Sequence, residues 1–436
     1  MAVVFVLVAL VMVGVLVTAN WYLWRRLFRD TTRAAGPVRR IGAAVIAGGW
    51  VLAVGALVAE RAGAPFWLQR VLAWPGFLWL ALSIYLLLAV LAGEVVRPLL
   101  RRFLERRAAA RHPEEAEPSV APAADTSRIP AGTAPPQAPG TPDAPQTPVP
   151  APGSASTSPL ALPSRRLFVS RVVAGAAAAA AVGTVGYGTY GVLSGPKVKR
   201  VTVPLAKLPR AAHGFRIAVV SDIHLGPVLG RGFAQRVVDT INATQPDLIA
   251  VVGDLVDGSV KDLGPAAAPL AQLRARHGAY FVTGNHEYFS GAEQWVAEVR
   301  RLGLLPLENA RTELPHFDLA GVNDVAGEDE GQGPDYAKAL GDRDRTRACV
   351  LLAHQPVQIH DAVDHGVDLQ LSGHTHGGQL WPGNLIAGAA NPTLAGLDRY
   401  GDTQLYVSRG AGAWGPPTRV GAPSDITVIE LASRQA

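Results

Sequence analysis

Three long apolar runs constrain the N-terminal part of this sequence more than any other feature. They cover residues 2–24, about 41–59 and about 66–93. About 20 apolar residues are enough to cross a bilayer as a helix, and the proline within the third run, Pro75, is tolerated in such helices. The whole chain is 49% hydrophobic and only 17% charged, a composition that favours membrane helices over a wholly soluble fold. We therefore predict a membrane domain with three transmembrane helices over residues 1–107.

The distribution of arginine predicts the orientation of these helices. A secretory signal peptide is the alternative interpretation of the first run, but its positive charges follow the apolar residues instead of preceding them. Arginines gather in two segments, 25–40 and 97–111. Because positively charged segments that flank membrane helices stay in the cytoplasm, both segments are predicted to be cytoplasmic. The N-terminus and the short link near residue 62 are then predicted to lie outside.

The next two segments are predicted to lead from the membrane domain to a C-terminal domain. Residues 108–163 are rich in Pro, Ala, Ser and Thr, a composition that cannot bury a core and predicts a disordered tether. Residues 164–194 combine Ser-Arg-Arg-Leu-Phe with an Ala/Gly-rich apolar run. This segment is interpreted as a fourth transmembrane helix or as a twin-arginine-like export signal, retained or cleaved; a buried core helix is the third alternative. The first two interpretations both place the following residues outside the cytoplasm.

The pattern changes at residue 195, where short apolar runs begin to alternate with amphipathic segments. Strands are predicted over 216–221, 248–252, 279–283, 348–353, 367–371, 404–408 and 425–431, and helices near 231–244, 266–276 and 291–302. Alternating strands and helices of this kind predict an α/β layered domain. The lone cysteine, Cys349, lies within an apolar run and is expected to be a buried strand residue.

Five short polar motifs follow predicted strands of this domain. They are Asp222-Ile223-His224, Gly253-Asp254, Gly284-Asn285-His286-Glu287, Ala353-His354 and Gly373-His374-Thr375-His376. Strand ends are where α/β folds place their ligands, and Asp with His suits divalent ions such as Mn, Fe or Zn. A carboxylate can bridge two such ions about 3.5–4 Å apart. The motifs together therefore predict a dinuclear metal site, whose excess positive charge matches a phosphate ester.

The motifs and the phrases around them resemble the calcineurin-like metallophosphoesterase superfamily. Ser-Asp-Ile-His-Leu-Gly, Gly-Asp-Leu-Val-Asp-Gly and Gly-His-Thr-His-Gly-Gly-Gln-Leu-Trp-Pro are similar to a bacterial membrane-associated branch, the YkuE/YaeI-like phosphodiesterases. The resemblance covers residues 195–436. It implies a four-layer αββα sandwich, preceded in this chain by N-terminal transmembrane helices.

The resemblance also implies roles for individual residues. The first metal would be held by Asp222, His224, Asp254 and His376, and the second by Asp254, Asn285, His354 and His374. Asp254 would bridge the ions, and a metal-bridging hydroxide would attack phosphorus. His286 would lie near the substrate, where it stabilises the transition state or protonates the leaving oxygen. No ligand of the family pattern is missing, which argues against a non-catalytic copy.

Four further features have weaker signals. Asp257 is a candidate for orienting a metal-binding side chain without binding the metal itself. The alternative is that it serves only to form a turn. Arg409 and Arg419 are expected to be solvated at the surface, with contact to a substrate phosphate as the alternative. The apolar residues of 384–400 are expected to pack within the domain, although contact with lipid is an alternative.

These observations predict a metal-dependent phosphoric ester hydrolase anchored in the cell membrane by several helices, with its catalytic domain extracytoplasmic. The expected substrate is a phosphodiester or a pyrophosphate, and proximity to the bilayer favours a lipid-borne one. Two alternatives stay open: a membrane sensor module that binds a phosphorylated ligand without turnover, and a cytoplasmic-face nucleotide-diphospho-lipid hydrolase. Nucleic acid is not an expected partner, because the catalytic half has no basic face with interleaved aromatic residues.

Overall fold

Four long helices precede the C-terminal domain. The computed structural model describes residues 2–111 and 164–434, so most of the predicted tether, 112–163, lies outside the described residues. The helices are α1 (Ala2–Trp24), α2 (Pro37–Arg61), α3 (Phe66–Arg111) and α4 (Arg165–Leu193). All four are long and apolar enough to cross a membrane. Helix α3 runs on through the first residues predicted for the tether and ends at Arg111.

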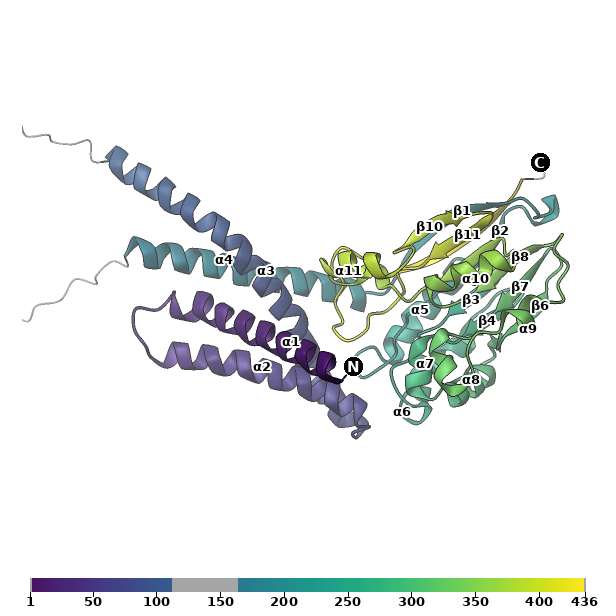
Figure 1. Cartoon of the computed structure of the whole chain (residues 1–436), viewed down its shortest axis with the longest axis horizontal. Coiled ribbons are helices and arrows are strands. Elements are labelled where there is room, and N and C mark those ends of the chain that lie inside the picture. The colour runs from purple at the N-terminus through teal and green to yellow at the C-terminus, as the bar shows by residue number, and fades with distance from the viewer. Residues whose placement is uncertain (1, 112–163, 435–436) are drawn as a thin grey trace, which may run out of the picture.

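The helices form a bundle whose two ends differ in charge. A short π-helical turn, η1 (Arg25–Arg29), follows α1 at the bundle end that lies away from the C-terminal domain. The C-terminal end of α3 and the N-terminal end of α4 lie at the same arginine-rich end (Figure 1). The link between α2 and α3 lies at the opposite end, next to the C-terminal domain. The arginine-rich segments and the C-terminal domain are therefore at opposite ends of the bundle.

Two six-stranded mixed sheets form the centre of the C-terminal domain. The first has the order β1-β12-β2-β3-β4-β5 and the second the order β10-β11-β9-β8-β7-β6. The first sheet contains β1 (Lys197–Leu205), β2 (Phe215–Val220), β3 (Leu248–Val252), β4 (Ala279–Val282), β5 (Leu305–Pro306) and β12 (Asp425–Ser433). The second contains β6 (Ala310–Glu313), β7 (Phe317–Gly321), β8 (Ala348–Leu352), β9 (Leu369–Ser372), β10 (Gly396–Tyr400) and β11 (Thr403–Val407).

The buried side chains define four layers, which confirms the predicted αββα sandwich. One hydrophobic cluster lies between the two sheets and joins residues such as Ile217 and Leu352. A second covers the outer face of the first sheet with α5 (Arg231–Ala243), α6 (Val260–Ala267) and α8 (Ala292–Arg301). A third covers the outer face of the second sheet with α9 (Tyr336–Leu340) and α10 (Ile359–Asp364). Cys349 is buried in this third cluster, as predicted.

The remaining helical elements are short. They are η2 (Arg210–Ala212), η3 (Ala268–Gln272), α7 (Asn285–Ser290), η4 (Val325–Glu330), η5 (Pro356–Gln358), η6 (His376–Gly378) and α11 (Gly383–Ala390). The helix predicted at 266–276 was misplaced. Helix α6 begins earlier, after Ser259, whose side chain accepts a hydrogen bond from the Asp262 amide, so that a capping side chain sets the start.

Strands with exposed or mixed faces were not predicted. Strand β1 begins with Lys197, alternates basic and apolar residues and is mostly exposed or half-buried. Strand β10 is likewise exposed or half-buried along its whole length. Both are outer strands of their sheets, where only one neighbour is required and a continuous apolar run is not needed. Apolar runs therefore predicted most central strands and missed these edge strands, and they also missed the buried strand β7, whose sequence Phe-Asp-Leu-Ala-Gly is not a continuous apolar run.

Candidate metal centre

The five motifs meet at the carboxyl ends of parallel strands. Strands β2, β3 and β4 are parallel neighbours in the first sheet, and β8 and β9 are parallel neighbours in the second. Each motif follows one of these strands directly. Because the two sheets are stacked, the two rows of strand ends face one another across the sandwich. Potential ligand atoms lie within 4.8 Å of one another in the groups Asp222/His224/His376, His224/Asp254/His286 and Asp254/His354/His374.

The backbone at these motifs adopts a conformation that side-chain-bearing residues rarely occupy. Five residues of the motifs have φ between 48° and 72°: Asp222, His224, Asp254, His374 and His376. Each such residue costs about 1–3 kcal/mol, and such strain persists only where surrounding structure enforces it. Gly373 shows how close the packing is, because a Cβ there would lie 2.5 Å from Asp222 Oδ2. The protein therefore holds these side chains in place at a cost in stability.

Asp222, His224 and His376 form one half of the centre, named here the Asp222 group. His224 Nε2 lies 3.0 Å from His376 Nε2, which in turn lies 3.4 Å from Asp222 Oδ1. The three side chains are almost fully buried. Two imidazole nitrogens and a carboxylate oxygen thus point at a common position, an arrangement that suits a divalent cation.

His354, His374 and Asn285 form the other half, named here the His354 group. His374 Nδ1 lies 3.0 Å from Asn285 Oδ1, and His354 Nε2 lies 3.1 Å from Asp254 Oδ2. His354 Nδ1 lies 2.9 Å from the carbonyl oxygen of Val252, so Nδ1 carries a proton and Nε2 is the nitrogen directed at Asp254.

The buried His354 Nε2 atom tests whether the cluster fits a metal. It is fully buried, and among the described residues it finds no partner with hydrogen-bond geometry, although Asp254 is close. A buried, unpaired nitrogen is costly, whereas a cation shared with Asp254 would satisfy it. Asp254 Oδ2 also lies 3.8 Å from His224 Nε2 of the other group. The donor set therefore fits two cations, with Asp254 positioned between them.

Asp257 supports two histidines at once. Its Oδ1 lies 2.8 Å from His224 Nδ1 and 2.7 Å from His286 Nδ1. Although burial opposes ionisation of Asp257, the charge and hydrogen bond of His224, with those of His286, lower its pKa to about 2. Asp257 therefore stays ionised and fixes the orientation of both rings, as a carboxylate behind a histidine ligand does.

Glu287 has a structural role that the sequence analysis did not assign. Its fully buried carboxylate accepts hydrogen bonds from the backbone amides of Asp254, Leu255 and Gly284, at 2.9, 2.8 and 2.6 Å. Burial and the nearby charge of Asp254 raise the pKa of Glu287 to about 7. The signal was available, because a Glu three residues after a helix-capping position commonly accepts a hydrogen bond from the capping residue's amide.

The expectation that Arg419 is solvated was wrong. Its guanidinium is buried and donates hydrogen bonds to the carbonyl oxygens of Gly412, His376 and Ala422, at 2.6, 3.0 and 3.2 Å. Its Nη2 also lies 3.1 Å from His376 Nδ1. Two of these carbonyls belong to the loop that carries Arg419 and the third to the distant His376 motif, so the local sequence does not reveal how the charge is held. Arg409 is partly exposed and lies 3.9 Å from Asp425.

Three histidines of the centre differ in their affinity for protons, and the difference does not follow the division into two groups. Burial, together with the charges of His224 and Arg419, lowers the pKa of His376 well below its usual range. Burial and the charge of His354 lower the pKa of His374 to about 4. Burial opposes protonation of His354 too, but the adjacent Asp254 raises its pKa well above the ordinary value. His376 and His374 are therefore neutral and able to coordinate at pH 7.

His286 lies at the mouth of the site between two exposed aromatic side chains. Its ring centroid is 5.6 Å from that of Phe289 and 5.5 Å from that of Trp414. Burial acts to lower the pKa of His286, but the hydrogen bond and charge of Asp257 raise it to about 9. The ring is oriented by Asp257 on one side and remains open to a substrate on the other.

The C-terminal end of α2 reaches the same mouth, an approach that no feature of the sequence predicted. Glu60 lies within electrostatic reach of Asp257, His286 and His224. The Arg61 guanidinium carbon lies 5.8 Å from the ring centroid of Phe289. A helical hairpin from the membrane bundle thus borders the candidate metal centre.

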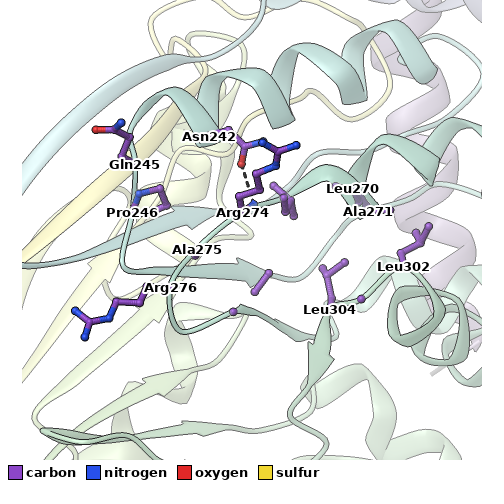
Figure 2. Close-up of a pocket in the computed structure, with 14 residues that line it drawn as sticks. Asn242, Gln245, Pro246, Leu270, Ala271, Arg274, Ala275, Arg276, Leu302 and Leu304 are labelled. Atoms are coloured by element: carbon purple, nitrogen blue, oxygen red, sulfur yellow. Dashed lines mark hydrogen bonds between the residues drawn. The ribbon is translucent and has the colours of Figure 1, made fainter.

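A separate surface cavity does not contribute to this chemistry. It has a volume of about 760 Å³ and is lined by residues of the α5–β3 turn, η3 and the segment after α8, including Asn242, Arg274 and Leu304 (Figure 2). Asn242 Oδ1 accepts a hydrogen bond from the Arg274 amide at 2.9 Å. The lining contains no carboxylate, histidine or cysteine, and it lies where β3 and β4 begin, at the edge opposite the metal-ligand motifs.

Comparison with known proteins agrees with the fold and identifies the family. Residues 215–378 match the family described as calcineurin-like phosphoesterase. A transmembrane protein with metallophosphoesterase domain from Danio rerio is 39% identical over 56% of this chain and 59% of its own length. An uncharacterized metallophosphoesterase from Helicobacter pylori strain J99 is 37% identical over 62% of this chain and 73% of its own. The uncharacterized metallophosphoesterase YkuE of Bacillus subtilis is 31% identical over 62% of this chain and 98% of its own.

The mixed-sheet sandwich and the Asp/His centre together define a metallophosphoesterase domain. The chain belongs to the calcineurin-like metallophosphoesterases, as the motifs predicted. The similarity to the zebrafish protein covers less than two thirds of that protein.

Proposed function

We propose that this protein is a membrane-anchored phosphoesterase with two divalent metal ions, which hydrolyses a phosphodiester or a pyrophosphate. The observation that carries the proposal is the placement of Asp254 between the two ligand groups, beside the unsatisfied His354 Nε2. A pair of ions bridged by a carboxylate is the arrangement that suits phosphoryl transfer.

The ligand sets follow from the two groups. The first ion would be held by Asp222, His224, Asp254 and His376, and the second by Asp254, Asn285, His354 and His374. Mn, Fe and Zn suit this mixture of imidazole and oxygen donors. When bound, the ions supply Lewis acidity toward the phosphoryl oxygens and activate a water nucleophile at neutral pH.

His286 is assigned to the leaving group. Its ring is held by Asp257 through Nδ1, so that Nε2 faces the mouth and can donate a proton to the departing oxygen or stabilise charge on the phosphoryl group. General acid catalysis of this kind contributes about 10²–10⁴-fold in rate. Phe289 and Trp414 flank the ring and limit the access of water to it.

The catalytic domain is proposed to be extracytoplasmic. Support comes from the two ends of the helical bundle: the arginine-rich segments lie at the end away from the catalytic domain (Figure 1), and such segments remain in the cytoplasm. A cysteine introduced at the exposed Asp402 tests this, because a membrane-impermeant maleimide should label it on intact cells. Labelling only after lysis would place the domain in the cytoplasm and favour a nucleotide-diphospho-lipid substrate.

Hydrolysis of small model esters by the full-length protein tests the proposed activity. The purified protein is offered bis(p-nitrophenyl) phosphate and p-nitrophenyl phosphate with Mn²⁺, Fe²⁺ or Zn²⁺, and with chelator. We expect metal-dependent turnover that is lost in Asp254→Asn and retained in Asp239→Asn, a matched change at an exposed aspartate of α5. A folded, metal-loaded protein that binds phosphate esters without turnover would instead support the sensor module.

A further inference from the structure

Helix α11 carries apolar side chains that the described part of the protein leaves uncovered. Leu385 is 67% exposed and Ile386 is 77% exposed, and Trp381, just before the helix, is 51% exposed. No residue of α11 is buried, and no charged residue occurs from Gly377 through Leu397. The expectation that the apolar residues of 384–400 pack within the domain was therefore wrong for α11. A contiguous exposed apolar surface of this kind marks an interaction site.

The segment before α11 is fastened to the membrane helices. The Tyr85 hydroxyl of α3 donates a hydrogen bond to the Trp381 carbonyl at 2.9 Å. Leu380 and Val420 pack against the hydrophobic cluster formed by the helical bundle. The apolar surface of α11 is thus continuous with the apolar surface of the bundle.

Helix α4 makes a second contact with the same part of the catalytic domain. The hydroxyls of Thr189 and Thr418 are 2.6 Å apart. Gly188 permits the close approach, because a Cβ there would lie 2.6 Å from the Arg419 carbonyl oxygen. The loop around Thr418 therefore has a fixed position along α4.

These contacts give the depth of α11 relative to the bilayer. At 1.5 Å per residue, Gly188 lies about 25 Å along α4 from Arg171, and Tyr85 lies about 18 Å along α3 from Arg97. If the two arginines mark one boundary of a hydrocarbon core about 30 Å thick, Gly188 lies about 5 Å inside the other boundary and Tyr85 about 12 Å inside it. The segment that leads into α11 then lies in the half of the bilayer next to the catalytic domain.

Exposed tyrosines on α4 mark the same level. Tyr187 and Tyr190 are 81% and 71% exposed, and both flank the contact at Gly188. Exposed aromatic residues near the end of a membrane helix are typical of the bilayer interface. Exposed apolar side chains near this depth, such as Leu385 and Ile386 of α11, would be removed from water by entering the lipid.

Helix α11 is also joined closely to the metal centre. The turn η6 contains His376 and ends at Gly378, where a Cβ would collide with Asn384 of α11. Gln379 Nε2 donates a hydrogen bond to the Trp414 carbonyl at 2.8 Å, and the Trp414 ring borders His286. The mouth of the site and the apolar face of α11 are therefore parts of one rigid unit.

We propose that α11, with Trp381, docks into the lipid surface beside α3 and α4 and presents the metal centre to phosphate esters whose alkyl chain remains in the bilayer. The occupant of the apolar face is lipid, because that face is continuous with the membrane helices and at their boundary. The inference about substrate class rests on the proposed phosphoesterase function. The docking itself does not.

Docking is tested without activity, by a fluorescent probe. Ile386→Cys is labelled with a polarity-sensitive maleimide dye in full-length protein reconstituted into nanodiscs of phosphatidylethanolamine and phosphatidylglycerol. The natural Cys349 does not compete, because it is buried and burial raises its thiol pKa to about 12. We expect blue-shifted emission that is quenched by brominated lipid and protected from iodide.

Leu305→Cys is the matched control. Leu305 is apolar and 47% exposed, but it lies on β5, the edge strand of the first sheet next to β4, and not on α11. Its probe should be quenched by iodide and not by brominated lipid. Equal iodide quenching at both positions, or protection from both quenchers at position 386, would overturn the docking.

The substrate class is tested with two esters that share a leaving group. Methyl p-nitrophenyl phosphate is soluble, whereas hexadecyl p-nitrophenyl phosphate is held in the nanodisc. We expect the double variant Leu385→Ser/Ile386→Ser to lose about tenfold in kcat/KM on the hexadecyl ester, because less apolar surface holds the site at the interface. Its rate on the methyl ester should be unchanged, as should both rates in Leu305→Ser.

The outcomes separate the two proposals. Equal loss on both esters, or none on either, would contradict lipid presentation while leaving phosphoesterase activity in place. Absence of wild-type turnover of both esters with every metal tested would contradict the proposed function and the substrate class that rests on it. The fluorescence result would still decide whether α11 docks into lipid.

Discussion

The two halves of the candidate metal centre share Asp254 but are supported in different ways. The Asp222 group is deeply buried and contains its own carboxylate, and Asp257 contacts Nδ1 of its His224. The His354 group has the neutral amide of Asn285 in place of a carboxylate, a backbone carbonyl behind His354, and a partly exposed His374.

This difference indicates that the two ions would not be equivalent. A cation gains more from two ionised carboxylates in a buried site than from one carboxylate and an amide in a partly solvated one. Arg419 reduces the advantage of the Asp222 group, because its charge lies 3.1 Å from His376 Nδ1. We still expect the Asp222 group to bind its ion more tightly, so that the His354 group loads second and releases first.

The largest effect should come from removing the residue that both halves share. Asp254→Asn takes the bridging charge from both groups, so we expect loss of both ions and a fall in turnover of at least about 10³-fold, equivalent to about 4 kcal/mol. Metal content by mass spectrometry and turnover of bis(p-nitrophenyl) phosphate measure the two effects. Retention of one tightly bound ion would show that the halves are more independent than their geometry indicates.

His286→Ala should separate chemistry from metal binding. The ring contacts Asp257 but belongs to neither proposed ligand set, so both ions should remain. We expect kcat to fall about 10²–10⁴-fold because a proton donor is lost, and less with an ester whose leaving group needs no proton. The comparison of p-nitrophenyl with alkyl leaving groups checks this. An equal loss on both kinds of ester would remove His286 from the proton-donating role.

How far sequence predicted this site depends on the range of the contacts involved. Asp222, His224 and Asp254 directly follow buried apolar strands, so their convergence at one sheet edge followed from local pattern and the parallel arrangement. Arg419 is held by carbonyl oxygens of Gly412 and Ala422 in its own loop and of His376 in a distant motif, and no local sequence pattern identifies this arrangement. Glu60 lies far along the chain from every motif, and its approach to His286 depends on how the bundle packs against the sandwich.

The same distinction applies to the fold. Continuous apolar composition predicted three of the long apolar helices, gave the fourth as one of several interpretations, and predicted most central strands, because burial on all sides leaves a signal in nearly every residue. It missed the buried strand β7, whose sequence Phe-Asp-Leu-Ala-Gly is too short and mixed to form an apolar run. Helix α11 also has apolar composition, but composition alone does not distinguish a face packed on protein from one left exposed beside a membrane. Its surroundings became clear only from the contact between Tyr85 and Trp381.

Asp257→Asn should sharpen the difference between the two halves with an intermediate effect. The amide cannot supply the charge that orients His224, and loss of such a partner typically weakens metal binding about 10–100-fold. The tighter of two binding steps in a metal titration should weaken, while the other step should be little changed. A selective loss of the weaker step would reverse the proposed order of the Asp222 and His354 groups. Asp239→Asn again serves as the control for a change of charge.

The smallest expected effect concerns the hairpin formed by α2 and α3, which borders the opening of the metal centre beside His286. Glu60 adds negative charge near the position of the substrate, and it should repel a phosphomonoester dianion more than a diester monoanion. Because the Glu60 carboxylate is partly solvated, its charge is partly screened. Glu60→Gln should therefore raise kcat/KM for p-nitrophenyl phosphate only about twofold to fivefold, and less for the diester. Glu105→Gln, at the far end of α3, is the matched control and should change neither rate. If Glu60→Gln changes kcat/KM equally for both esters, the α2–α3 hairpin affects the arrangement of residues around His286 and does not act through the charge of Glu60. The two metal-ligand groups alone would then determine the preference between monoester and diester.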